Sequence, residues 1–331
     1  MSRYKSISLE KVQTYSVENR FSKVDRNAFA KPLTKSATFS EFWLSLPDFL
    51  AVRDLKELVD HMFAARGRRP IMWMTGAHPL KVGLSPILLD LLRNGWISSL
   101  ASHGAFAVHD CEIALFGRTS EEVAETLRDG KFGMAKETGE FFVEAIAAST
   151  GKQLGLGEAL GEALIRARAP YLRDSLLAQC LEANVPLTVH VAIGTDIVHE
   201  HPGLSGAALG EASYRDFLIF SEIVSKLGDG GVALNIGSAV IMPEVFLKAI
   251  AIARNLGYPC HDFYTANFDM LQHYRPLQNV VKRPTMTGGK GYAFTGHHEI
   301  MLPLLAAALK QEPSASAQRS KDGPTGSANI Q

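Results

Sequence analysis

The chain has 331 residues, of which 46% are hydrophobic and 21% charged, with 34 basic and 34 acidic side chains. This length allows one large α/β domain with additions, or two domains. The balanced charge argues against nucleic-acid binding, which usually requires a basic surplus. The N-terminus lacks the apolar run of a secretory signal, and no stretch reaches the roughly 18 apolar residues of a membrane span. The composition therefore predicts a cytoplasmic protein that does not enter a membrane.

The three cysteines, Cys111, Cys180 and Cys260, are far apart in the sequence and form no CxxC pair. Such spacing offers no disulfide framework and no zinc motif. We expect all three to be free thiols that pack as small buried residues.

The composition divides the chain into three zones. Residues 1–60 are polar at first and then rich in aromatic residues, which predicts an N-terminal arm that packs on the core or on a neighbouring subunit. Residues 61–311 alternate apolar runs with helical patterns and predict one α/β domain. Residues 312–331 are rich in Ser, Ala, Gly and Pro, so we expect a disordered tail.

The central zone repeats a strand–loop–helix unit. In chain order the sequence predicts a strand at 71–75, a helix at 84–94, a strand at 97–102, helices at 120–128, 134–149, 156–168 and 173–183, a strand at 187–193, a helix at 213–226, a strand at 232–236, a helix at 242–255, a strand at 262–266 and a helix at 299–310. Short apolar runs that each lead to a helix are typical of a parallel sheet covered on both faces. We therefore expect an α/β fold with a doubly wound, mostly parallel, Rossmann-like sheet.

Small residues follow every predicted strand, as Thr75-Gly76, Ser102-His103-Gly104, Ile193-Gly194-Thr195, Ile236-Gly237-Ser238 and Thr265-Ala266-Asn267. Parallel sheets bind ligands beyond the carboxyl ends of their strands. Glycine lets the backbone approach a pyrophosphate, and a helix N-terminus offers it free N–H groups. The sequence has no GxGxxG motif, but the repeated pattern predicts a dinucleotide pocket.

Several histidines lie next to carboxylates. His109-Asp110 can act as an oriented acid–base pair, or can lie on a helix surface with a capping carboxylate. His190, His199 and His201 are residues of a type that binds zinc, but they lack the HExxH spacing, so no metal site is assigned. His297-His298-Glu299 precedes the last helix and can form a cap and a pocket wall.

The segment 275–290 contains several basic residues together with Gly and Pro, and we expect it to be a loop after the last strand. Lys282 can form an imine with a carbonyl compound if burial lowers its pKa, and Lys290 is the alternative. We expect Lys282 to face the strand ends. Arg275 can bind a substrate carboxylate, because a guanidinium pairs with a carboxylate through two hydrogen bonds.

Several stretches together resemble deoxyhypusine synthase. They are TGAHPLKVGLSPILLDLLRNGWISSLASHGAFAVHD (75–110), NVPLTVHVAIGTD (184–196), ALNIGSAVIMPEVFLKAIAIARNLG (233–257), TANFD (265–269) and GHHEIMLPLL (296–305). The stretch GAFAVHDCE also resembles the NAD-binding domain of archaeal-type ornithine cyclodeaminases. The resemblance covers most of residues 70–310 and rests on the order and spacing of these motifs.

The resemblance implies an NAD site at the strand ends of a homotetramer, with sites between subunits. Carried over by position, the cofactor contacts are Thr75, Gly76, Ser102, Gly104, Asp196, Gly237, Ser238, Thr265, Ala266 and His297. The imine-forming lysine of the family falls at or near Lys282, with His109, Asp110 or Asp269 assisting, and we assign Arg275 and His199 to substrate binding.

Two departures from the family concern the substrate. Gly237-Ser238-Ala239 and Met242-Pro243 stand where the synthase has a triple glycine and its histidines, and residues 272–276 replace its acidic loop. We therefore expect an NAD-dependent enzyme that acts on a small amine or amino acid through an imine, and not deoxyhypusine synthesis. The alternatives are a nucleotide-binding sensor or scaffold without activity and, behind it, a metal-dependent hydrolase.

Overall fold

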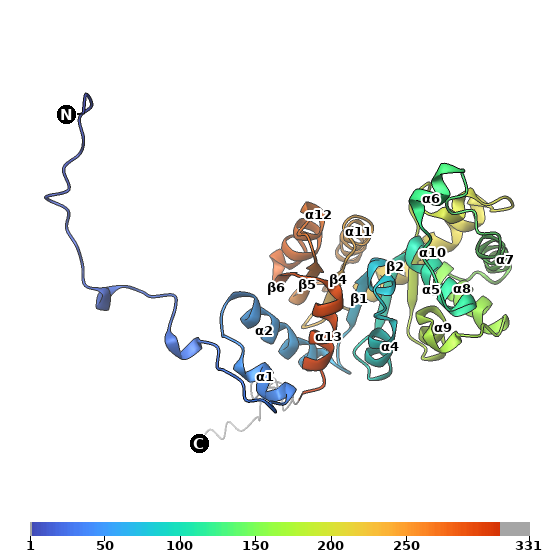
Figure 1. Ribbon diagram of the computed structural model, residues 1–331. Helices are drawn as coiled ribbons and strands as arrows, with labels where there is room; N and C mark the ends of the chain where they lie inside the picture. Colours follow the sequence, from blue (N-terminus) through green and yellow to red (C-terminus); the bar gives the residue numbers. More distant parts are fainter. Residues whose placement is uncertain (1, 312–331) are drawn as a thin grey trace, which may run out of the picture. The chain divides into compact units, whose positions relative to one another are not determined.

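Six parallel strands form one sheet in the computed structural model, which describes residues 2–311 (Figure 1). They are β1 (Ile71–Thr75), β2 (Ser99–His103), β3 (Leu187–His190), β4 (Val232–Ile236), β5 (Phe263–Asp269) and β6 (Gly289–Thr295). Their order is β3-β2-β1-β4-β5-β6, and each neighbouring pair is parallel. This is the strand order of a Rossmann fold, and it confirms the predicted fold class.

Helices cover both faces of the sheet. They are α2 (Leu50–Ala65), α3 (His78–Lys81), α4 (Ser85–Arg93), α5 (Gly104–Phe116), α6 (Val123–Arg128), α7 (Lys136–Lys152), α8 (Leu156–Arg166), α9 (Leu176–Glu182), α10 (Gly206–Val224), α11 (Ile241–Asn255), α12 (Tyr274–Pro276) and α13 (His298–Ala308). Three short 3-10 turns, η3 (Leu172–Asp174), η4 (Ile197–Glu200) and η6 (Pro284–Thr287), and one π-helix, η5 (Leu277–Lys282), complete the set. In Figure 1, α11 and α12 lie on one face, and α4 and α13 on the other. No helix among residues 2–311 is long and apolar enough to cross a membrane.

The core between the sheet and helices α10 and α11 is made of large apolar side chains. Met72 and Met74 of β1 pack there with Phe220 of α10 and with Met242 and Phe246 of α11. Cys260 belongs to the same cluster, and Cys111 and Cys180 are also buried and free, as the sequence predicts. Burial of this apolar surface holds the strands in register and so fixes where each strand ends.

The free edge of β3 is covered by polar side chains of α10. Asp216 accepts hydrogen bonds from the Val189 N–H at 2.7 Å and the Gly157 N–H at 2.9 Å. Ser213 accepts from the Val191 N–H and donates to the Val189 carbonyl, both at 3.0 Å. Burial raises the pKa of Asp216 to about 7. These contacts satisfy backbone groups that an edge strand otherwise leaves open to pairing with another chain.

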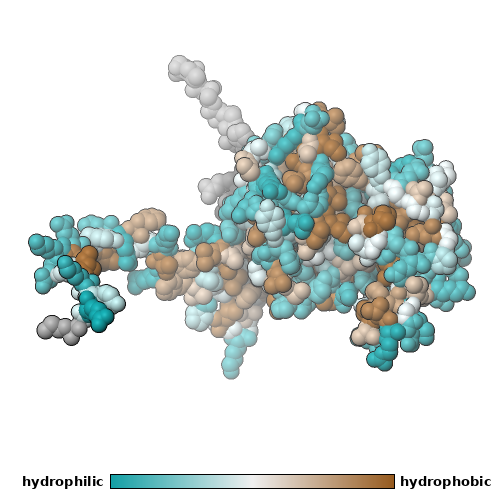
Figure 2. All heavy atoms as spheres, turned by 90° about the horizontal axis from the view of Figure 1, so that it is seen from above, coloured by the Kyte–Doolittle hydropathy of each residue, from teal (hydrophilic) through white to brown (hydrophobic). Residues whose placement is uncertain are grey.

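The N-terminal segment forms a separate unit, and the division between the two units falls after Val52. It contains two single turns, η1 (Val17–Asn19) and η2 (Arg26–Ala28), and one helix, α1 (Phe39–Ser45), which a capping box of Thr38 and Glu41 begins. Many apolar side chains of this segment are exposed, as Figure 2 shows, among them Tyr4, Ile7, Leu9, Phe21 and Val24. Packing of the arm on the core or on a neighbouring subunit stays a prediction. The predicted disordered tail, 312–331, lies outside the described residues.

Several predicted bounds are wrong: β3 ends at His190 and not at residue 193, and α10 begins at Gly206 and not at residue 213. Two further errors bear on the site. Strand β5 does not end at residue 266 but continues to Asp269. The segment 275–290 is not a loop, because it forms α12, η5 and η6 and then enters β6. The glycines at 288, 289 and 291 are untypical of a strand, so the sequence did not indicate this one. They are needed because a Cβ at Gly289 would lie 1.9 Å from the Phe263 carbonyl oxygen, and one at Gly291 would lie 2.0 Å from the Val281 carbonyl oxygen.

Candidate functional site

The strand order reverses between β1 and β4, and two glycines meet at this point. The Gly76 N–H donates to the Ile236 carbonyl at 2.8 Å, and the Gly237 N–H donates to the Phe268 carbonyl at 3.0 Å. A Cβ at Gly76 would lie 2.3 Å from the Gly237 carbonyl oxygen. Gly237 has a φ of 66°, in the left-handed region that favours glycine. In open α/β sheets this reversal is where a crevice for ligands forms.

The N-terminus of α11 is open at this crevice. Within the described part of the chain, the backbone N–H groups of residues 238–241 donate no hydrogen bond, and the Met242 N–H donates to Ser238 Oγ at 3.2 Å. Free N–H groups at a helix N-terminus attract a phosphate. This end of α11 therefore fits the pyrophosphate of a dinucleotide.

The N-terminus of α5, in contrast, is occupied by a carboxylate of the protein itself. A Cβ at Gly104 would lie 2.1 Å from Oδ2 of Asp196, and the Ala105 N–H donates to the same carboxylate. Burial raises the pKa of Asp196. The carboxylate occupies the position that a phosphate would take at α5, so Gly104 and Asp196 act here as a cap, and the sequence did not predict this pairing.

Four of the predicted cofactor contacts have their side chains turned into the protein. Thr75 and Ser102 are buried, and their hydroxyls donate to the carbonyls of Gly76 at 2.8 Å and Thr75 at 2.5 Å. Thr265 and Ala266 are fully buried inside β5, and the Thr265 hydroxyl donates to the Val280 carbonyl at 2.7 Å. Because β5 continues to Asp269, Thr265 and Ala266 lie below the strand end, contrary to the prediction.

Two histidines meet over Gly237. His78 is the first residue of α3, which follows β1, and His298 is the first residue of α13, which follows β6. Their Nδ1 atoms are 2.9 Å apart, and His298 Nε2 lies 3.2 Å from the Phe268 carbonyl oxygen. A Cβ at Gly237 would lie 2.6 Å from the His298 ring. Burial lowers the pKa of His298. This pair therefore lies directly at the crevice between β1 and β4.

Asp269 and His297 are also at this edge of the sheet. Asp269 ends β5 and is buried, its Oδ1 accepts from the Met270 N–H at 2.8 Å, and its charge acts to raise the pKa of His298. His297 precedes α13, and its side chain is exposed and lies 3.8 Å from Glu299. Of the neighbouring histidines 297 and 298, the second makes the buried contact, although the sequence assigned the first to the cofactor.

A second histidine pair lies at the ends of β2 and β3. His103 and His190 are paired in the register of these strands. Burial lowers the pKa of His103 to about 4, with a smaller effect from His109. Burial lowers the pKa of His190 to about 3, with a smaller effect from His103, and its Nε2 lies 3.0 Å from the Thr188 hydroxyl. Both rings are therefore neutral at pH 7.

His109 and Asp110 do not form an acid–base pair. Asp110 is fully buried and accepts hydrogen bonds from Ser175 Oγ at 2.5 Å and from the Leu176 and Leu177 N–H groups at 2.8 and 3.0 Å, so it caps α9. His109 Nδ1 instead lies 2.6 Å from the Thr119 hydroxyl, which also contacts Glu112. Neighbouring residues of a helix point about 100° apart, which separates the two side chains.

The histidines near residue 200 do not converge on a metal ion. His199 Nδ1 accepts from the Gly194 and Asp196 N–H groups, both at 3.2 Å, and His201 Nε2 lies 2.9 Å from the Gly133 carbonyl oxygen. His190 is enclosed beside Phe220. The part of the chain that the structure describes contains no group of three side chains that could hold a metal. His199 thus holds the loop after β3 in shape.

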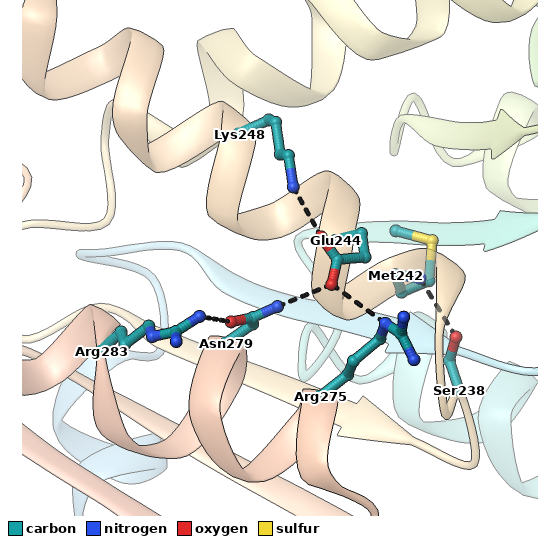
Figure 3. A network of polar contacts seen from close by, with 7 residues as sticks. All are labelled: Ser238, Met242, Glu244, Lys248, Arg275, Asn279 and Arg283. Carbon is teal, nitrogen blue, oxygen red and sulfur yellow. Dashed lines mark hydrogen bonds and ion pairs between the residues drawn. The ribbon is translucent and has the colours of Figure 1, made fainter.

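Arg275 is paired with a carboxylate of the protein (Figure 3). Its Nε lies 3.3 Å from Glu244 Oε1, which also accepts from Asn279 at 2.9 Å, while Lys248 contacts Oε2 at 2.5 Å. Lys248 and Arg275 lower the pKa of Glu244. The pairing compensates the charge of Arg275, which the sequence assigned to a substrate carboxylate.

Lys282 lies away from the carboxyl edge of the sheet, next to Val281, which contacts Gly291 opposite Thr265 in the first half of β5. The connection from β5 starts at the carboxyl edge and returns to Gly289, which pairs with Phe263 at the first residue of β5. Lys282 ends η5 on this return path and is exposed, contrary to the prediction that it faces the strand ends. Lys290, the alternative, is bound to Asp54 at 3.0 Å and Glu57 at 2.6 Å. The error follows from the missed helix, because a loop of the same length could have stayed at the carboxyl edge.

Comparisons with known proteins gave a result only at the level of structure. No family model matches the sequence, and no curated protein matches it. A solved protein of Entamoeba histolytica, described as a deoxyhypusine synthase, is similar over 84% of this chain and 95% of its own, with 11% identity and a TM-score of 0.48. At this identity the likeness concerns the fold alone.

Two further solved structures are similar. A protein of Methanococcus maripaludis S2 described as LOR/SDH matches over 78% of this chain and 69% of its own, with 17% identity and a TM-score of 0.47. AgrE, solved with ornithine and NAD+, matches over 78% of this chain, with 13% identity and a TM-score of 0.46. The match covers 33% of AgrE, so this chain corresponds to about a third of that protein.

Proposed function

We propose that this protein is an NAD-dependent enzyme that acts on a small amine or amino acid, with the dinucleotide lying across the ends of β1 and β4. The proposal rests on one observation: the strand order reverses where Gly76 and Gly237 meet, directly before the open N-terminus of α11. The pyrophosphate would lie beside the small residues 237–239, where the free N–H groups of residues 238–241 accept it. We further propose a homotetramer in the cytoplasm.

Bound NAD would supply the hydride acceptor for the carbon that carries the amine, and loss of that hydride would leave an imine. The residues of this chain would bind the phosphates, orient the amine and receive its proton. Gly237 and Ser238 serve the first task. His78, His298 and Asp269 lie at the same edge of the sheet and can serve the others. The exposed position of Lys282 removes it from this set within one chain.

A nucleotide-binding sensor without activity is the second candidate. It is favoured by the closed N-terminus of α5 and by the buried hydroxyls of Thr75 and Ser102, because these groups serve the fold and leave fewer side chains for a substrate. The two candidates differ in turnover: an enzyme forms NADH from NAD+ and an amine, whereas a sensor binds NAD+ and forms none.

We expect NAD+ to raise the melting temperature of the wild type, and Ala239→Glu to abolish this shift. Ala239 is half-buried just before α11, so a carboxylate there repels the pyrophosphate and competes for its N–H groups. Ala239→Gln is the matched control, since it adds the same bulk without charge. Thermal unfolding of the three proteins with and without NAD+ measures these shifts. The absorbance spectrum of the purified protein shows whether NADH is already bound. An equal shift in all three proteins would refute the placement at α11.

A further inference from the structure

When both rings are neutral, only one set of proton positions satisfies the hydrogen bonds of His78 and His298. The Phe268 carbonyl oxygen can only accept, so His298 Nε2, 3.2 Å away, must carry a proton. Burial lowers the pKa of His298 and so favours the neutral ring, in which Nδ1 has a lone pair and no proton. The contact of 2.9 Å between the two Nδ1 atoms then requires that His78 Nδ1 donates.

These positions leave His78 with a free lone pair on Nε2. In this tautomer the proton on Nδ1 is bound by His298, which is itself held by the backbone of β5. His78 is half-buried, whereas His298 is buried, so His78 is the member of the pair that a ligand can reach. It follows β1 directly, at the crevice where β1 and β4 diverge.

We propose that His78 is the catalytic base of this site and that Nε2 takes a proton from the ammonium group of the substrate. This role rests on the proposed function. An ammonium group has no lone pair, so its carbon cannot release hydride until one N–H bond breaks. The proton moves to His78 Nε2, the electron pair of that bond stays on the substrate nitrogen, and the positive charge passes from the ammonium to the imidazole ring. His298 is a positioning residue, because it acts through His78.

Three neighbouring features suit this transfer. The charge of Asp269 acts to raise the pKa of His298, so a carboxylate lies near the ring that binds His78. Gly237 leaves room for the His298 ring, which a Cβ would approach to 2.6 Å. The hydrogen bond to His298 also fixes the tautomer of His78, as a second group commonly does for a histidine that acts as a base.

The proton positions can be measured without any reaction. In the 15N-labelled full-length protein at pH 7.5, long-range 1H–15N correlations of the histidine rings distinguish protonated from unprotonated nitrogens. We expect His298 to carry its proton on Nε2 and His78 on Nδ1, with signals assigned by their loss in His298→Gln and His78→Gln. A proton on Nε2 of His78 at this pH would overturn the proposal, because that nitrogen could then not accept another.

The role in catalysis is tested by NADH formation from NAD+ and the proteinogenic L-amino acids, L-ornithine or putrescine. His78→Gln keeps an N–H donor toward His298 but has no basic nitrogen. We expect it to lower kcat about 100-fold or more, while the NAD+-induced shift in melting temperature stays within a degree of the wild type. His261→Gln, at the opposite end of β5, is the control and should keep full activity.

The outcomes separate the two proposals. If the wild type binds no NAD+ or forms no NADH with any probe, the proposed function fails, and the role of His78 in it fails too. If the wild type forms NADH and His78→Gln forms it equally fast, the role of His78 alone is refuted. Recovery of activity when free imidazole is added to His78→Ala would support proton transfer over a purely structural role.

Discussion

Gly76→Ala is expected to destabilise the protein by about 3 kcal/mol, at the upper end of the usual cost of overpacking. The added Cβ would lie 2.3 Å from the carbonyl oxygen and 2.9 Å from the carbonyl carbon of Gly237. Both neighbours are backbone atoms of the turn after β4 and cannot rotate away. The Gly76 N–H is also bound to the Ile236 carbonyl, so the strand end cannot shift without breaking that bond. Chemical unfolding at pH 7.5 measures the effect.

Gly210→Ala is the matched control for this substitution. Gly210 is exposed within α10, and a Cβ there would meet no atom within 4 Å. Because alanine favours a helix more than glycine does, we expect Gly210→Ala to stabilise the protein by about 0.5–1 kcal/mol. A Gly76→Ala protein that unfolds at the same denaturant concentration as the wild type would show that β1 and β4 are not so close at their ends.

The layout of the sheet is predictable from this sequence because its central strands are short apolar runs that lead into helices. Residues 71–75 and 232–236 are strands with the predicted bounds, and both are fully buried. Local pattern suffices there, since a strand covered on both faces must be apolar throughout. The same argument fails for β6, which lies at the edge of the sheet, contains two glycines and alternates exposed and buried residues in its second half.

The polar residues of the site were predicted less well than the strands. Sequence position placed Thr75, Ser102 and Asp196 at strand ends, but it could not show that their oxygens contact the protein's own backbone. The choice between His297 and His298 depends on which side chain the start of α13 turns inward. His78 follows Gly76 within the predicted pocket, and its meeting with a residue 220 positions later depends on tertiary packing that a local pattern does not contain.

The second large effect concerns acid pH. The folded state holds His103 with a pKa of about 4, mainly through burial, whereas an exposed histidine has one of about 6.5. The neutral ring contributes its full share of stability above pH 6.5, and that share is lost as the pH falls toward 4. Between pH 7.5 and pH 5, the loss from His103 alone is about 2 kcal/mol. His190, whose pKa is lowered to about 3, acts in the same direction.

Buried carboxyls oppose this trend. Burial raises the pKa of Asp110 to about 6 and that of Asp216 to about 7, so each contributes stability that is complete below about pH 4 and is lost as the pH rises through these values. The wild type therefore combines two opposite dependences, and its own pH profile is expected to be shallow. Single substitutions separate the two sets, because the packing cost of a substitution does not depend on pH.

We expect His103→Asn to gain about 2 kcal/mol relative to the wild type when the pH is lowered from 7.5 to 5, whatever its cost at pH 7.5, because the variant has no ring to protonate on unfolding. Asp110→Asn should lose about 1.4 kcal/mol relative to the wild type over the same interval, since it cannot take up the proton that the folded wild type binds. Urea unfolding of the three proteins at both pH values measures these differences. If His103→Asn differs from the wild type by the same amount at pH 7.5 and pH 5, then His103 titrates alike in the folded and unfolded chain, and the ring is in contact with water at the end of β2.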